Sequence, residues 1–90
     1  MLLKTPYELV VDAAARFRRV RKAKNITVKA LSEKSGVPYS TIRRFESSGE
    51  ISFVSLVKLA SAIGEDGQIT ALFAESIPAS IEEVIRGNRK

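Results

Sequence analysis

The 90-residue sequence predicts an all-α fold: a compact domain of five helices with a short extra C-terminal helix. Two observations lead to this prediction. Apolar residues recur three and four positions apart, which is the spacing of one helix face, and they nowhere alternate as in a strand. Capping residues precede these stretches, and glycine, asparagine or proline follows them. With 44% hydrophobic and 28% charged residues, the composition is typical of a single globular domain covering residues 1–90.

The first helix is expected to begin after Thr5. The tetrapeptide Thr5-Pro6-Tyr7-Glu8 is a capping box with proline at the first helical position. Asn25 tolerates the left-handed conformation that ends a helix, so the helix should stop there. Four apolar residues at helical spacing define its expected inner face: Val10, Ala13, Phe17 and Val20.

Two short helices and a tight turn follow, over about residues 27–47. The first of the two is capped by Thr27 and ends at Gly36, and the second covers roughly Pro38–Ser47. The three-residue turn between them, with a glycine that permits positive φ, is helix-turn-helix geometry. Three apolar residues are expected to fix the second helix against the first and against the core: Val37, Ile42 and Phe45.

Ser52 is expected to cap a fourth helix that ends at Gly64. Its inner face would consist of Phe53, Leu56, Val57, Ala60 and Ile63. A fifth helix, which follows residues 65–67 and is broken by Pro78, would carry Ile69, Leu72 and Phe73. A second capping box at residues 80–83 opens the short last helix, and residues 86–90 would form a frayed basic tail.

The composition excludes several classes of function. The chain has no cysteine and no histidine, which removes Cys–His nucleophiles, Ser–His–Asp triads and the commonest zinc and haem sites. We therefore expect no catalytic residue, no metal and no cofactor. No segment resembles a signal peptide or is apolar enough to cross a membrane, so the protein is expected to be cytoplasmic and without a membrane partner.

Charge is strongly polarised along the chain. Residues 16–44 contain ten basic side chains and one acid, whereas residues 45–85 contain one base and seven acids. A basic half of this kind suits a polyanion such as nucleic acid, although an isolated basic stretch is often only a solvated face.

The outer face of the motif's second helix carries Tyr39, Ser40, Arg43 and Arg44. Residues three and four apart share a helix face, so these side chains form one outward surface. Arginine can bond guanine or phosphate with two parallel hydrogen bonds, and hydroxyl groups can bond bases or backbone. Two plainer interpretations stay open. The two arginines could simply solubilise an exposed face, and Tyr39 could pack its ring on the preceding helix.

The stretch RFRRVRKAKNITVKALSEKSGVPYSTIRRFESSG, residues 16–49, resembles the phage-repressor-like (Xre/Cro–CI) helix-turn-helix family. The resemblance covers about residues 8–64. It implies that the motif's second helix lies in the major groove of double-stranded operator DNA and that a homodimer binds an inverted repeat. By position, it assigns DNA contacts to Pro38, Tyr39, Ser40, Arg43 and Arg44.

The resemblance also assigns supporting roles. Lys29 falls where a phosphate is held. Lys22 belongs to the basic cluster of the first helix, Arg16–Lys24, which is expected to contact phosphates. Val28 replaces the usual glutamine and can donate nothing, so Lys29 or Thr27 is expected to take over its phosphate contact. Arg21 and Glu46 match a structural ion pair. The alternative for that pair is a solvated surface contact worth well under about 1 kcal/mol.

Residues 66–85 are the expected dimer or partner region, with Leu72, Phe73 and Ile77 as its apolar residues. The alternative is that Leu72 and Phe73 close the core over the fourth helix. The segments FESSGEISFVSLVKLASAIG and ALFAESIPASIEEV also look like a subgroup encoded beside Hip-type kinase toxins. That likeness implies a DNA-binding antitoxin that represses its own toxin–antitoxin operon. The alternatives are an antitoxin or assembly subunit that acts mainly through its acidic C-terminal third, or a phage-type or restriction-modification regulator.

Overall fold

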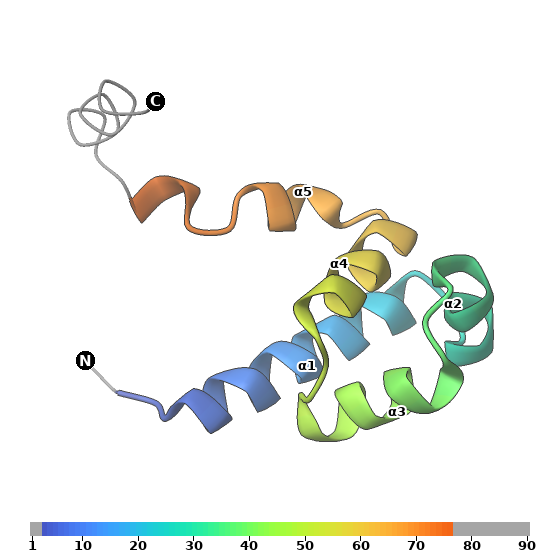
Figure 1. Ribbon diagram of the computed structural model, residues 1–90, viewed down its shortest axis with the longest axis horizontal. Coiled ribbons are helices and arrows are strands. Elements are labelled where there is room, and N and C mark those ends of the chain that lie inside the picture. Colours follow the sequence, from blue (N-terminus) through green and yellow to red (C-terminus); the bar gives the residue numbers. More distant parts are fainter. Residues whose placement is uncertain (1–2, 77–90) are drawn as a thin grey trace.

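The computed structural model describes residues 3–76, and this part of the chain is all-helical (Figure 1). Its elements are α1 (Pro6–Ala23), α2 (Val28–Ser35), α3 (Tyr39–Ser48), α4 (Phe53–Ala62), α5 (Asp66–Thr70) and a final 3₁₀ turn (Ala74–Ser76). The all-α, five-helix prediction is confirmed. The short sixth helix, Ile77 and the basic tail at residues 86–90 lie outside the described residues.

The helix ends follow the capping signals of the sequence. Thr5 and Glu8 form the complete capping box of α1. The hydroxyl oxygens of Thr27 and Ser52 accept hydrogen bonds from backbone amides in the first turns of α2 and α4. Asn25, just after α1, has φ +60°, the left-handed conformation expected there. Pro38 stands at the N-cap of α3 and gives no side-chain hydrogen bond, so this helix depends on packing for its start.

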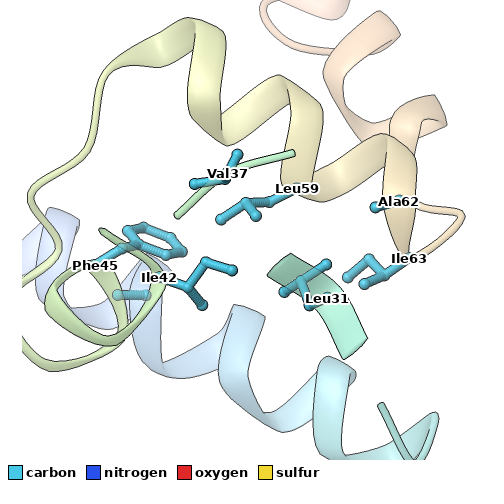
Figure 2. Close-up of a cluster of buried hydrophobic side chains, with 8 residues drawn as sticks. Leu31, Val37, Ile42, Phe45, Leu59, Ala62 and Ile63 are labelled. Atoms are coloured by element: carbon cyan, nitrogen blue, oxygen red, sulfur yellow. The ribbon is translucent and has the colours of Figure 1, made fainter. Parts of the chain in front are cut away.

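The core lies where α2, α3 and α4 meet over α1 (Figure 2). Leu31, Val37, Ile42 and Leu59 are fully buried, and Ile63 closes the cluster from the end of α4. Phe45 on α3 belongs to the same cluster, and its ring meets that of Phe17 on α1 edge to face, with centroids 5.4 Å apart. This small apolar cluster fixes α3 relative to the other helices. The candidate functional residues lie on α3.

The inner face of α1 was predicted wrongly in its first half. Ala14, not Ala13, is buried, and Val10 is 41% exposed. Periodicity identifies an apolar stripe, but it does not say how far along the helix other elements cover that stripe. Here the N-terminal half of α1 extends beyond the core (Figure 1).

The inner face of α4 also differs from the prediction. Phe53 is 56% exposed, whereas Leu59, absent from the expected face, is completely buried. Eight of the eleven residues from Phe53 to Ile63 are apolar, so the sequence favours no single face of this helix. Packing against α2 and α5 decides which side is covered.

The fifth helix is shorter than expected. It ends at Thr70, and Phe73 adopts φ +62°, which no helix can continue through. Leu72 and Phe73 are 46% and 75% exposed, so the interpretation that they close the core over α4 is wrong for the described chain.

Candidate nucleic-acid interface

The turn before α3 sets the direction in which that helix presents its outer face. Gly36 ends α2 with φ +80°, and Val37 is buried directly after it. Ile42 and Phe45 then hold the inner face of α3 in the core. The opposite face remains exposed and carries Tyr39, Ser40, Arg43 and Arg44, with Pro38 exposed at its start. The residues that sequence analysis selected therefore lie together on one accessible helix.

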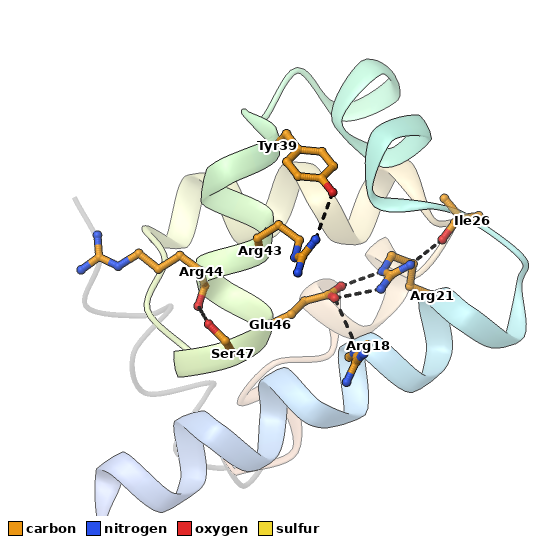
Figure 3. Close-up of polar contacts among 8 residues, drawn as sticks. All are labelled: Arg18, Arg21, Ile26, Tyr39, Arg43, Arg44, Glu46 and Ser47. Atoms are coloured by element: carbon orange, nitrogen blue, oxygen red, sulfur yellow. Dashed lines mark hydrogen bonds and ion pairs between the residues drawn. The ribbon is translucent and has the colours of Figure 1, made fainter.

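Tyr39 and Arg43 are engaged with each other on this face (Figure 3). A terminal nitrogen of Arg43 donates a 3.0 Å hydrogen bond to the Tyr39 hydroxyl, and the guanidinium carbon lies 5.8 Å from the centre of the ring. Tyr39 is 48% exposed, so its ring is available at the surface. The pair presents an aromatic ring and a guanidinium as one unit.

Arg44 is placed differently from Arg43, although the two are neighbours in sequence. It points away from Arg43 (Figure 3) and pairs with the Glu50 carboxylate just after α3. Both partners are well exposed, so solvent screens this ion pair. The Glu50 carboxylate nonetheless partly neutralises the positive charge with which Arg44 could attract an anion.

Arg21 and Glu46 form a buried, two-pronged ion pair beneath the exposed face (Figure 3). Nε and Nη2 of Arg21 donate to the two Glu46 oxygens at 2.7 and 2.8 Å, and Nη1 donates to the Ile26 carbonyl at 2.7 Å. Each of the two side chains is 7% exposed. This geometry is that of the structural ion pair and not of a solvated surface contact, and it ties α1 to α3.

A hollow of about 320 Å³ opens to solvent between α1, the start of α2 and α3. Its lining residues are Arg18, Arg21, Val28, Arg43, Glu46 and Ser47. Nε of Arg18 lies 3.9 Å from the Glu46 carboxylate, which Arg21 already occupies with two hydrogen bonds. Arg18 cannot be singled out from the sequence, because it is one of several neighbouring basic residues on the first helix.

The expected phosphate contacts have different surroundings. Lys22 and Lys29 are exposed. The Thr27 hydroxyl oxygen accepts a 3.0 Å hydrogen bond from the Ala30 amide, and its hydroxyl hydrogen can be donated to a phosphate. Lys24, also a member of the basic cluster, donates to the Ile63 carbonyl at 2.6 Å and pairs with Glu65 at 3.0 Å. Lys24 therefore joins α1 to the end of α4, a role without any sequence signal.

Two carboxyl groups in the described chain have a lowered pKa. A hydrogen bond from Gln68, with help from Lys24, lowers the pKa of Glu65, and a hydrogen bond from Lys4 lowers the pKa of Asp12. Neither group lies on the exposed face of α3. Within residues 3–76, no group of three or more potential metal ligands is brought together, and no helix is long and apolar enough to cross a membrane.

The comparisons with known proteins agree with this geometry. A family model described as helix-turn-helix, of the Xre/Cro–CI type, matches residues 17–69, which is more than half of the chain. No curated protein and no solved structure matches. The matched range contains α2, α3 and the whole exposed face described above.

Proposed function

Because this chain belongs to the Xre/Cro–CI-type helix-turn-helix family, a family of DNA-binding regulator domains, we propose that it is a sequence-specific transcriptional repressor. In this proposal α3 enters the major groove of an operator, and the outer face of α3 reads base edges. The observation that supports it most strongly is that face itself. Its polar and basic side chains are exposed, while the core and the Arg21–Glu46 pair anchor the helix beneath them.

Arg43 and Lys22 are expected to affect DNA binding in different ways. Arg43→Ala should weaken operator binding by about 1–3 kcal/mol and relax preference at one base pair, because a guanidinium fork discriminates guanine from other bases. Lys22→Ala should weaken all DNA sequences alike and reduce the salt dependence, since a lysine on α1 meets phosphates. Titration of each variant against operator and random duplexes measures both effects. Equal weakening of both duplexes by Arg43→Ala would make Arg43 a phosphate contact.

The proposed repressor acts as a homodimer on an inverted repeat. Two half-sites require two recognition helices in fixed relation, so a surface must join the subunits. The exposed Leu72 and Phe73 support residues 66–85 as that surface, because large apolar side chains exposed together favour association. Ile77, the third residue assigned to this region, lies outside the described residues.

Phe73→Asn is expected to convert the dimer into a monomer and to lower operator affinity. Asparagine tolerates the left-handed conformation of Phe73, so the monomer fold should survive. The matched control is Phe53→Asn, which removes another exposed phenylalanine, outside residues 66–85. Sedimentation equilibrium gives the mass of each variant. A monomer from Phe53→Asn and a dimer from Phe73→Asn would place the interface at the start of α4 instead.

We further propose that the repressor regulates its own operon and that a second protein, such as a kinase toxin, binds its acidic C-terminal third. The likeness of residues 45–64 and 71–84 to the subgroup beside Hip-type kinases supports this proposal. The separation of a basic DNA-facing half from an acidic half with exposed apolar side chains supports it too. Co-purification of the full chain with the product of the neighbouring gene tests it. Failure of the two proteins to associate would leave a repressor without a toxin partner.

A further inference from the structure

The two adjacent arginines of α3 have opposite surroundings. Arg43 donates to the Tyr39 hydroxyl at 3.0 Å and lies over the same residue's ring, which is neutral. Arg44 pairs with a carboxylate, that of Glu50. A neutral phenol does not neutralise the positive charge of a guanidinium, so the full charge can attract an incoming ligand. A carboxylate neutralises that charge, and the ion pair must open or be shared before the guanidinium can bind another anion.

We infer that Tyr39 is a positioning residue that holds the Arg43 guanidinium for a base edge, so that Arg43, and not Arg44, is the specificity-determining arginine of α3. This inference rests on the proposed function and assigns roles within its binding face. It differs from the simpler expectation that Tyr39, Arg43 and Arg44 each contact DNA independently.

The flexibility of the arginine side chain determines what binding a base costs. A free surface arginine samples many rotamers and loses them when it binds a base in one geometry. The hydrogen bond to Tyr39 and the contact with its ring restrict Arg43 before DNA arrives. Among residues 3–76, Arg43 uses a single donor, the one bonded to Tyr39, so its other N–H groups can form two parallel hydrogen bonds to guanine. A side chain that is already restrained loses less conformational entropy when it binds, so its affinity for the base is higher.

The decisive variant is Tyr39→Phe, which removes the hydroxyl and keeps the ring. We expect about a three- to tenfold loss of affinity for a duplex from upstream of the protein's own reading frame, the usual scale of one hydrogen bond. Binding to shuffled duplex should stay unchanged. Tyr7→Phe is the matched control, because Tyr7 is the other tyrosine of the chain, is 69% exposed and lies on α1. It should behave as wild type on both duplexes.

A double-mutant cycle separates positioning from direct contact. In an Arg43→Ala background, Tyr39→Phe should have no further effect, because the hydroxyl acts only through the guanidinium. Additive losses would show that the Tyr39 hydroxyl contacts DNA itself and would overturn the inference. Arg44→Ala should weaken upstream and shuffled duplexes equally, and a larger loss on the upstream duplex would also overturn it.

A measurement without DNA keeps this inference distinct from the proposed function. NMR relaxation of the Arg43 side-chain Nε–H group should show restricted motion in the free wild-type protein and increased motion in Tyr39→Phe. Equal mobility in both proteins would contradict the positioning role, whatever the DNA results. Restricted motion combined with equal wild-type affinity for upstream and shuffled duplexes would instead contradict the proposed specific repressor.

Discussion

Replacing Glu46 with alanine is expected to lower the free energy of unfolding by about 3–5 kcal/mol, as for a buried ion pair that loses one partner. Glu46 accepts two hydrogen bonds from Arg21, and both side chains are 7% exposed. Without the carboxylate, the guanidinium stays buried, and the Ile26 carbonyl is the one hydrogen-bond partner left to it within the described part of the chain. A small domain is stable by about 5–15 kcal/mol, so this loss is a large share of the total. Urea denaturation measures it directly.

Two further variants make this prediction specific. Glu33→Ala, on the exposed surface of α2, should change stability by no more than about 0.5 kcal/mol. The double variant Arg21→Met with Glu46→Leu should cost less than Glu46→Ala alone, because it removes both buried charges together. If Glu46→Ala behaved like Glu33→Ala, the pair would be an ordinary surface contact and α3 would not depend on it.

Gly49→Ala is the second change with a large expected effect, about 2–5 kcal/mol of lost stability. Gly49 ends α3 with φ +82°, where a side chain is strained. An added Cβ would also lie 2.2 Å from Val10 Cγ1 and 2.9 Å from the Val10 carbonyl oxygen. The carbonyl belongs to the backbone of α1 and cannot rotate away, so α1 and α3 would have to separate.

Gly36→Ala provides the matched control for this prediction. Gly36 has nearly the same φ, +80°, but an added Cβ would have no atom within 4 Å. Only the backbone strain remains, so the expected cost is about 1–2 kcal/mol. Thermal unfolding of both variants compares them. Equal losses would show that the approach of Val10 to Gly49 does not matter for stability.

The sequence predicts the starts of α1, α2 and α4 well, because caps are local. Thr5, Thr27 and Ser52 each bond an amide within three residues, so their signals do not depend on the rest of the fold. Burial is less predictable. Phe53 and Leu59 lie on the same apolar helix, and only the placement of α2 and α5 leaves the first exposed and buries the second.

In the candidate site, too, local features can be predicted from the sequence, whereas side-chain contacts cannot. Periodicity and the family resemblance indicate which residues of α3 point outward, because Ile42 and Phe45 must point inward. They do not indicate the contact between Tyr39 and Arg43 or the one between Arg44 and Glu50, since both depend on side-chain geometry. The link from Lys24 to the Ile63 carbonyl spans 39 positions and involves a backbone acceptor, so no side-chain pattern could reveal it.

Sequence-specific binding of the protein to DNA from upstream of its own reading frame can be measured by fluorescence anisotropy. The upstream duplex and a shuffled duplex of equal length would each be titrated at about 50 and 200 mM salt. For a sequence-specific repressor we expect at least about 1,000-fold tighter binding to the upstream duplex. Affinity for both duplexes should fall with salt, because phosphate contacts from the proposed basic DNA-facing half would release counterions. Equal affinity for the two duplexes, falling to the same extent as salt rises, would show that the protein is not a sequence-specific repressor.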